Sequence, residues 1–382
     1  MNIKAVYSME KNIDLAVADL KKQLNGFDTR MLVVFSSSSY AQEELIARIK
    51  SNFASALVCG CSTAGEIVSG KMMKESVVAM ALNGNVIGDA KIEVIDNIKE
   101  INKVKEAFDS FARYYNEPVA AMDPERYIGM VLMDGLSKSE EKVMDRIGDL
   151  TNVVFIGGSA GDDLKFSRTY VYGDGKAYTN AAVLVLIKPK VRFDIIKTQS
   201  FVVLDHKFTA TKVDPEARAV IEFDHQPAAK VYSEALGVSM DDLEKYFMSN
   251  PVGLLIDNEV YVRSPSQLKG TSVFFFCNIL EGMEVSLLES TDIVGDTRLA
   301  VLNKKKEMGE ISGILNFHCI LRTLELERKG QTEEYGSIFA DIPTIGFSTY
   351  GEEYIGHINQ TSTMLVFGVE RLDFEESGRC PG

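Results

Sequence analysis

The chain has 382 residues, of which 46% are hydrophobic and 25% charged, an ordinary composition for a globular protein. Its length suggests two domains or one large one, with a core that needs neither disulfides nor a structural metal. The excess of 55 acidic over 41 basic residues gives a net charge of −14, which argues against nucleic-acid binding. The one conspicuous basic run, Lys304 to Lys306, is expected to be a solvated helix face.

Membrane insertion, secretion and metal binding are not expected from the sequence. No apolar run reaches the roughly 18 residues of a membrane-spanning helix, and Met1 to Asp14 lack the apolar stretch of a secretory signal. Four of the five cysteines lie in apolar segments, as reduced thiols of a cytoplasmic protein would. The Cys59-x-Cys61 pair has no second cluster of zinc-like spacing, and no phosphate-binding glycine loop is present. We therefore expect a cytoplasmic protein without metal or cofactor. The cysteines are Cys59, Cys61, Cys277, Cys319 and Cys380.

One unit recurs along the chain, and such self-similarity identifies segments with the same structural role. In the first copy an apolar run, Met31 to Phe35, leads into a helical pattern and then into a Gly-Cys-Ser-Thr-Ala-Gly-Glu turn at 60–66. The second copy begins at Ile128 to Met133 and ends in a Gly-Gly-Ser-Ala-Gly-Asp-Asp turn at 157–163, with the same spacing. A third, less regular copy begins at Ile314 to Phe317 and ends in a similar turn at 346–352.

Each copy has the length of a β-α-β element and is followed by a further apolar run. These runs are residues 76–82, 180–187 and 363–368. The pattern predicts an α/β (mixed α+β) fold of layered mixed sheets with repeated β-α-β-β units in two packed halves. Helices such as Glu100 to Tyr115 are expected to cover one sheet face.

A change of pattern near Phe223 predicts the domain boundary. It separates an N-terminal domain at 24–222, with its internal duplication, from a C-terminal domain at 223–368 and a polar tail at 369–382. After the boundary the sequence predicts two helices, one from Pro227 to Leu236 and one that starts at Ser239. No linker-like tract separates the halves, so we expect them to pack together.

The repeated turn combines small glycines with a hydroxyl side chain and a nearby acidic residue, which can form a polar ligand pocket. The same residue types also simply satisfy turn backbone groups, so both interpretations stay open. A nucleophile elbow does not fit the spacing, and only His318 lies beside a candidate nucleophile, Cys319. Adjacent strand residues point to opposite faces, which argues against that pair. The candidate turn residues are Ser62, Thr63, Glu66, Ser159 and Asp162.

The third copy is richer in residues suited to ligand binding. Arg322 and Arg263 can bind a carboxylate, although a single arginine is more often a structural ion-pair partner. Glu352 and Asn359 can accept hydrogen bonds from an amine, so that both ends of an amino acid would be held. The full candidate set is Arg263, Cys319, Arg322, Ser348, Thr349, Gly351, Glu352, Asn359 and Thr361.

These residues resemble the FIST sensory domain. The segments similar to its N-terminal half are Leu32 to Ser36, Gly60 to Glu66 and Gly157 to Asp163. The segments similar to its C-terminal half are Tyr232 with Leu236 and Gly237, Val262 with Arg263, Cys319 to Arg322, Pro343 to Glu352, and Asn359 to Thr361. The similarity runs in order from about Met31 to Gly368, which is more specific than any single motif.

The resemblance implies a signal-transduction sensor that binds a small ligand, with amino acids as the proposed class. Members often carry a fused output module, so here the signal is expected to pass to a separate kinase, chemoreceptor or cyclic-dinucleotide enzyme. Two alternatives remain. One is a hydrolase or transferase that uses Ser62, Ser159 or Cys319 as nucleophile, and the other is a ligand-free interaction scaffold.

Overall fold

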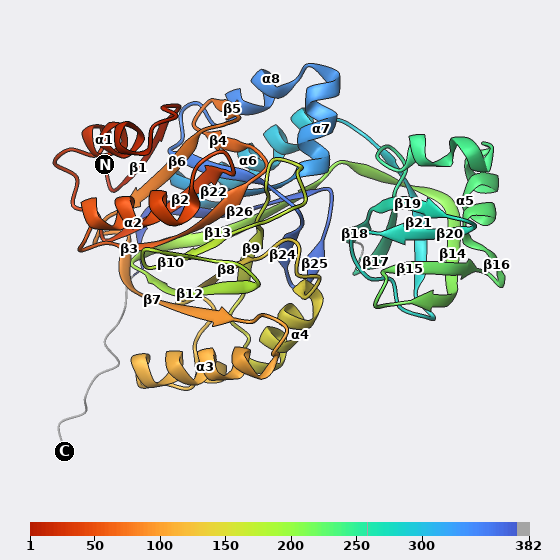
Figure 1. Cartoon of the computed structure of the whole chain (residues 1–382), viewed down its shortest axis with the longest axis horizontal. Coiled ribbons are helices and arrows are strands. Elements are labelled where there is room, and N and C mark those ends of the chain that lie inside the picture. The colour runs from red at the N-terminus through yellow and green to blue at the C-terminus, as the bar shows by residue number, and fades with distance from the viewer. Residues whose placement is uncertain (258, 373–382) are drawn as a thin grey trace.

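A large body and a smaller lobe make up the computed structural model, which describes residues 1–257 and 259–372 (Figure 1). The body comprises residues 1–200 and 291–372, and the small lobe comprises residues 201–290. Helices cover mixed parallel and antiparallel sheets, which confirms the predicted α/β class. Cys380 and most of the predicted tail at 369–382 lie outside the described residues.

Three similar repeats build the body. Repeat 1 contains β1 (Ile3–Ser8), α1 (Ile13–Gln23), β2 (Met31–Ser37), α2 (Gln42–Asn52), β3 (Leu57–Thr63), β4 (Glu66–Val68), β5 (Lys71–Met73) and β6 (Val77–Leu82). Repeat 2 contains β7 (Ile87–Asp96), α3 (Asn102–Tyr115), η1 (Val119–Ala121), β8 (Ile128–Met133), α4 (Glu140–Leu150), β9 (Phe155–Ser159), β10 (Val171–Gly173), β11 (Lys176–Tyr178) and β12 (Ala181–Pro189). Repeat 3 contains β13 (Val191–Gln199), α6 (Ile293–Met308), β22 (Ile311–Cys319), α7 (Ile320–Lys329), α8 (Thr332–Ser337), β23 (Thr344–Thr349), β24 (Glu352–Tyr354), β25 (His357–Ile358) and β26 (Thr361–Arg371).

Each repeat completes the sheet of another repeat with its short hairpin. The hairpin β10–β11 of repeat 2 pairs with β3 in the sheet of repeat 1. In the same way β24–β25 pairs with β9 of repeat 2, and β4–β5 pairs with β23 of repeat 3. The segments 24–222 and 223–368 therefore share sheets as well as packing together. The pattern of apolar residues could not reveal this exchange, because it does not specify which strands pair.

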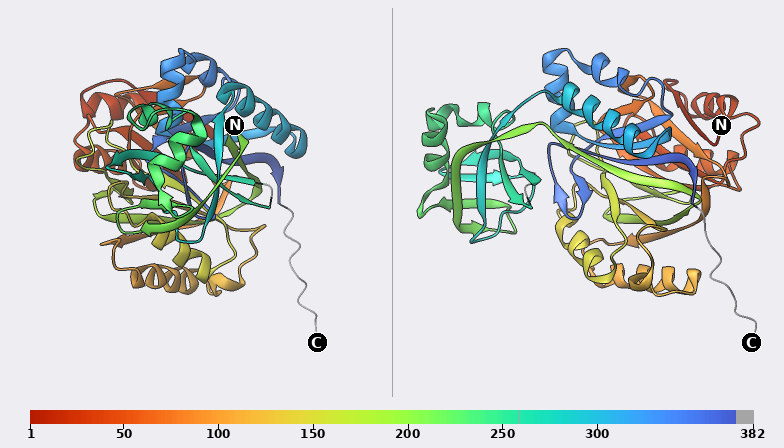
Figure 2. Two further views of the ribbon diagram at one scale, coloured as in Figure 1. Left: turned by 90° about the vertical axis from the view of Figure 1, so that its right-hand side faces the viewer. Right: turned by 180° about the vertical axis from the view of Figure 1, so that it is seen from behind.

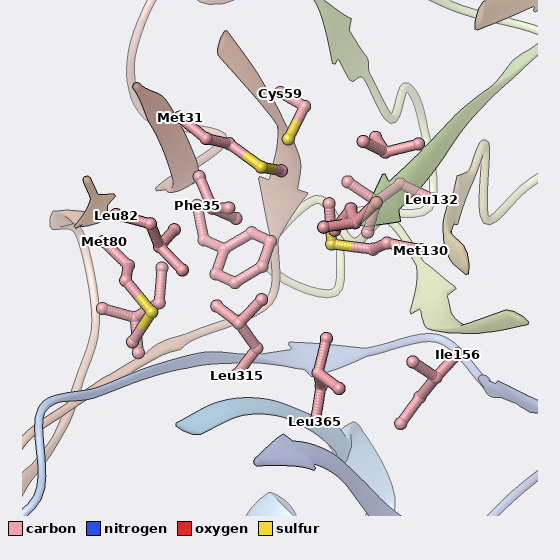
Figure 3. Close-up of a cluster of buried hydrophobic side chains, with 14 of the residues drawn as sticks. Met31, Phe35, Cys59, Met80, Leu82, Met130, Leu132, Ile156, Leu315 and Leu365 are labelled. Atoms are coloured by element: carbon pink, nitrogen blue, oxygen red, sulfur yellow. The ribbon is translucent and has the colours of Figure 1, made fainter. Parts of the chain in front are cut away.

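The main hydrophobic core lies where the three sheets face one another (Figure 3). It combines side chains from all three repeats, among them Phe35, Met130 and Leu315. The ring of Phe35 contacts Phe347 at 4.5 Å and Phe317 at 6.3 Å between ring centroids. Burial of this shared core is the main apolar contribution that holds the repeats together.

The three repeated turns also meet, because main-chain hydrogen bonds link them in pairs. The amide of Gly161 donates to the carbonyl of Ser62 at 3.0 Å, and that of Ala64 donates to Ser348 at 3.2 Å. The amide of Tyr350 donates to the carbonyl of Ser159 at 3.0 Å. The turns thus form one structural cluster.

The small lobe is inserted into repeat 3, between β13 and α6, and the chain crosses to it twice (Figure 2). Its elements are β14 (Phe201–Asp214), β15 (Ala219–Phe223), β16 (Gln226–Pro227), α5 (Ala228–Leu236), η2 (Met240–Tyr246), β17 (Val252–Ile256), β18 (Glu259–Arg263), β19 (Pro265–Lys269), β20 (Ser272–Phe275) and β21 (Glu284–Ser290). The lobe has its own apolar core around Phe223 and Tyr232. The predicted boundary near Phe223 therefore falls at the end of β15, inside the lobe.

The helix predicted to start at Ser239 is present as the 3-10 helix η2, with Ser239 as its N-cap. One local expectation is corrected. The Lys304 ammonium is only partly exposed, because it pairs with Asp194 at 2.8 Å and Glu307 at 2.9 Å. Lys304 is therefore an ion-pair partner and not part of a freely solvated face.

One glycine in each repeated turn permits close strand contact. A Cβ atom added to Gly60, Gly157 or Gly346 would lie 1.7, 1.7 or 2.3 Å from a main-chain carbonyl oxygen of the parallel neighbouring strand. Real Cβ atoms do not approach a carbonyl so closely, so the strands would have to separate.

We predict that Gly157→Ala lowers the free energy of unfolding by about 3 kcal/mol or more, because a backbone atom cannot move aside cheaply. Gly148→Ala is the matched control, since the Cβ atom meets open space on α4 and alanine favours a helix by about 1 kcal/mol. Denaturant unfolding of both variants measures the difference. Equal stability of the two variants would contradict the close-contact explanation.

Candidate functional site

A cavity of about 680 Å³ lies between the body and the small lobe. Its body side is formed after the ends of β8 and β22, near Gly135 and Cys319, and its lobe side includes Phe274. In α/β folds, ligands bind in crevices outside the carboxyl ends of the parallel strands. β8 and β22 are each paired in parallel with the next strand of their repeat, so the position matches that rule.

Aromatic and aliphatic side chains dominate the walls of the cavity. On the body side Phe166 and Tyr350 stack with ring centroids 5.0 Å apart and an interplanar angle of 24°. The hydroxyl of Tyr350 donates to Asp162 Oδ1 at 2.5 Å and accepts from the amide of Leu164 at 2.9 Å. The predicted turn residue Asp162 thus fixes the orientation of an aromatic wall.

Polar side chains from both the body and the small lobe complete the lining. Asn359 is 1% exposed, and its Oδ1 atom has no hydrogen-bond partner within residues 1–257 and 259–372. A buried acceptor without a partner is costly, which makes this atom suited to a ligand donor. The other polar side chains of the lining are Lys138, Glu140, Arg218, Ser266, Gln267 and Lys269.

Ion pairs at the edge of the cavity join the small lobe to α4. The Arg218 guanidinium binds Glu140 at 2.8 Å and Glu141 at 2.6 Å, and it also donates to the carbonyl of Phe276 at 2.7 Å. The Arg218 side chain is 11% exposed and that of Glu140 is 3% exposed. The pair is therefore largely shielded from water, and its electrostatic attraction is stronger than it would be in bulk water.

A second contact between the lobe and the body runs through Gln360. Its Oε1 accepts from the hydroxyl of Ser264 at 2.7 Å, and its Nε2 donates to the carbonyl of Met248 at 2.8 Å. Gln360 is 1% exposed and has a left-handed backbone with φ of 50°. Both ends of its side-chain amide are therefore committed to the lobe.

A buried His357–Glu353 pair lies beside the same junction, with Nδ1 and Oε1 2.9 Å apart. Burial lowers the pKa of His357, but the Glu353, Glu140 and Glu141 carboxylates outweigh it and raise the pKa to about 9. Burial also raises the pKa of Glu353. His357 is thus protonated at neutral pH, and its charge compensates several carboxylates of the junction.

The two predicted glutamates, Glu66 and Glu352, have matching internal partners. Glu66 accepts from the Thr63 hydroxyl and from the hydroxyl and amide of Ser76 at 2.6 and 3.1 Å. Glu352 accepts from the Thr349 hydroxyl and from the hydroxyl and amide of Thr361 at 2.6 and 3.1 Å. Burial raises the pKa of each glutamate to about 7. Both side chains thus fasten a hairpin to the turn that precedes it.

The turn serines are likewise bonded within the protein. The Ser62 hydroxyl donates to the carbonyl of Gly161 at 2.7 Å, and Ser159 donates to Glu353 at 3.2 Å. Ser348 shares a hydrogen bond with Thr323 at 2.8 Å. These three side chains join the repeats at the turn cluster.

Of the predicted ligand-binding residues, Cys319 and Asn359 line the cavity. The members placed elsewhere are Arg263, Arg322, Ser348, Thr349, Gly351, Glu352 and Thr361. Arg263 donates to the carbonyl of Asn278 at 3.1 Å within the lobe. Gly351 lies against His357, so closely that a Cβ atom there would lie 2.1 Å from the imidazole ring.

Arg322 is buried at the start of α7, with 1% of its surface exposed. Its guanidinium donates to three hydroxyls, those of Thr297 at 3.0 Å, Ser200 at 3.4 Å and Thr198 at 3.5 Å. In the part of the chain that the structure describes, no carboxylate lies within 4.0 Å of it, and its Nε atom has no partner. Arg322 is thus a buried cation near the crossing to the small lobe.

The thiol of Cys319 has a pKa raised well above its usual value by burial and by Glu352. The neighbouring His318 points elsewhere, since its Nδ1 lies 2.9 Å from the hydroxyl of Tyr335. Burial, with the nearby Arg322 charge, lowers the pKa of His318 well below its usual value. The two residues therefore do not form a nucleophile–base pair.

Sequence reasoning missed Arg218 and the aromatic walls of the cavity, and it left Gln360 out of the ligand-binding set although Gln360 lies in a segment that it had singled out. Arg218 gave no signal, because its partners on α4 are distant in sequence and meet it only through the placement of the lobe. His357 was detectable, because Glu353 precedes it by four residues at the turn that had already been singled out.

Comparison with known families decides the identity of the chain. A model described as the FIST N domain matches residues 30–226, and one described as the FIST C domain matches residues 228–354. The chain belongs to the FIST family. FIST domains are sensory domains of signal transduction. The cavity lies between the two matched segments, since the FIST N segment supplies Arg218 and the FIST C segment supplies Phe274.

A curated relative of this FIST protein is an uncharacterized protein of Methanocaldococcus jannaschii. The two are 26% identical over 264 residues, which are 65% of this chain and 51% of the relative. The chain thus spans about half the length of the curated relative it matches. Among the described residues, the helices of the FIST protein are all too short or too polar to cross a membrane.

We predict that Arg218→Met lowers the free energy of unfolding by about 3 kcal/mol or more, because it leaves the buried Glu140 carboxylate without its partner. Lys142→Met is the control, because it breaks an exposed ion pair with Glu216 worth less than about 1 kcal/mol. Denaturant unfolding measures both. A loss for Arg218→Met no larger than for the control would show that the junction contributes little.

The His357 pair predicts a pH dependence of stability. Because the folded-state pKa of about 9 exceeds the usual 6.5, His357 contributes stability that is complete below pH 6.5 and is lost as the pH rises through 9. The free energy of unfolding should therefore fall more steeply over this range in the wild type than in His357→Gln. Urea titrations at several pH values measure the two slopes, and parallel slopes would contradict the assignment.

Proposed function

We propose that this FIST protein is a cytoplasmic sensor that binds a small, amino-acid-like ligand in the cavity between the body and the small lobe. The observation that carries the proposal is the buried, unpartnered Oδ1 atom of Asn359, a residue that lines a cavity with walls from both parts. A ligand in this place contacts the body and the lobe together. It can therefore change how they pack against each other.

The chain around Asn359 supplies a path from ligand to lobe. Asn359 lines the cavity, the next residue Gln360 holds the lobe through Ser264 and Met248, and Thr361 is fixed to Glu352 in the body. A displacement of Asn359 would reach the lobe through Gln360, which is the next residue and is followed by Thr361, held by Glu352. A ligand shifts the lobe position only by its difference in affinity for the two arrangements.

The chemistry of the candidate nucleophiles supports sensing over catalysis. A serine nucleophile needs a base that takes its proton. The Glu353 oxygen that accepts from Ser159 is already held by the protonated His357, which weakens it as a base. The Cys319 thiol stays protonated, since its pKa is raised. The buried, free Cys59, Cys61 and Cys277 agree with a reducing compartment.

The signal would pass to a separate output protein, such as a kinase, a chemoreceptor or a cyclic-dinucleotide enzyme. A change in the packing of the small lobe alters the surface around the junction, which is what such a partner would recognise. The support is the two-point attachment of the lobe through Arg218 and Gln360, which a ligand can strengthen or weaken.

A single tryptophan provides the test, because the natural chain contains none. Phe274→Trp places an indole in the cavity wall on the lobe side, whereas Tyr246→Trp places one on the exposed side of η2 as a control. Titration with a panel of amino acids should shift the emission of the first variant and not that of the second. The free energy of unfolding of the wild type should rise in parallel, by about 2.7 kcal/mol at a ligand concentration of 100 times the dissociation constant. Thermal unfolding with and without the ligand measures this rise.

The absence of any emission change or stabilisation across the panel, with both variants folded, would contradict the sensor proposal. An equal shift in both variants would place the ligand outside the cavity.

A further inference from the structure

The walls of the cavity favour a ligand with a flat apolar group. The stacked Phe166 and Tyr350 face the cavity from the body, and Phe274, Phe275 and Phe276 line it from the lobe. Aromatic rings bury large apolar areas against other rings and gain further attraction from offset or edge contacts. A polar side chain packed against these rings would lose its water without gaining a hydrogen-bond partner from them.

The volume of the cavity sets the size of that group. Pockets of about 300–1,000 Å³ bury most of a drug-sized molecule, and this cavity measures about 680 Å³. It therefore has room for a ring as large as an indole. A small side chain would leave part of the apolar wall uncovered.

Charges at the cavity favour an acidic group on the ligand. Lys138 and Lys269 add positive charge to the lining, whereas Arg218 is already paired with Glu140 and Glu141. This contrasts with the net charge of −14 of the whole chain. The first turn of α7, which includes Ile320 and Leu321, forms part of the same wall. The N-terminal end of a helix attracts negative groups.

The buried Oδ1 atom of Asn359 favours a hydrogen-bond donor on the ligand, because this acceptor has no partner among the described residues. Asn359 lines the same cavity as the α7 turn and the aromatic walls. An ammonium group is the donor that would gain most there, because hydrogen bonds to charged groups are the stronger ones.

We propose that the ligand is an aromatic amino acid, whose ring lies between the aromatic walls, whose ammonium binds Asn359 Oδ1 and whose carboxylate faces the first turn of α7. This inference rests on the proposed function and narrows it to one class of side chain. It assigns to Asn359 the recognition of the amine, and to the rings of both parts the selection of the side chain.

Isothermal titration of the wild-type chain with single amino acids tests the class. L-Phenylalanine and L-tryptophan are expected to bind at least tenfold more tightly than L-aspartate, L-lysine and L-serine. Tighter binding of any of these polar amino acids would overturn the inference while leaving the sensor proposal intact. No binding of any amino acid, with the protein folded, would overturn both.

A comparison of two related probes tests the orientation. Asn359→Leu should weaken binding of L-phenylalanine by about 10- to 100-fold, because a hydrogen bond to the ammonium is lost. The same variant should bind 3-phenylpropionate, which lacks the amine, as well as the wild type does. Asn152→Leu, at an exposed position, is the control and should leave both affinities unchanged.

An equal loss for both probes would overturn the assignment of Asn359 to the amine. Unaltered binding of L-phenylalanine to a folded Asn359→Leu would overturn it as well. The thermal unfolding midpoint of each variant shows that it is folded before the titration.

Discussion

Exchange of hairpins between the three repeats is the constraint on which the rest of the structure depends. Each sheet is incomplete without two strands from another repeat, and the main-chain hydrogen bonds of that pairing bring the three turns together. The glycines of the turns are needed for the same reason, because strands approach there without room for a Cβ atom. Once the turns are joined, the ends of β8 and β22 lie at one side of the body, where the inserted lobe covers them and leaves the cavity.

Much of the framework could be predicted from the sequence, because it depends on local pattern. The repeats, the α/β class and the position of the turns follow from apolar periodicity and from the spacing of glycine and serine. The insertion of the lobe was not predictable, because the segments before and after it in repeat 3 are separated by the lobe sequence. The exchange of hairpins depends on pairing between distant strands, which no local pattern encodes.

The candidate site was harder to predict, because the same residue types serve the fold and the ligand. Glu352 resembles a ligand acceptor, but both its oxygens are occupied by Thr349 and Thr361. Glu66 has the same arrangement in repeat 1, so this pair of residues belongs to the repeat and not to one site. Asn359 differs in that its acceptor atom is left without a partner among the described residues, which only coordinates can reveal. The buried Arg322, which donates to Thr198 and Thr297, marks the alternative position for a ligand, away from the cavity.

The central claim is that a ligand lies between the body and the small lobe, and hydrogen–deuterium exchange of the whole chain tests it most directly. With saturating L-phenylalanine, exchange should slow on both sides of the cavity. The segments expected to slow are 134–140 and 319–324 in the body and 217–218 and 273–276 in the lobe. Slowing on only one side, or confined to the surroundings of Arg322 at 197–200 and 293–299, would contradict the account.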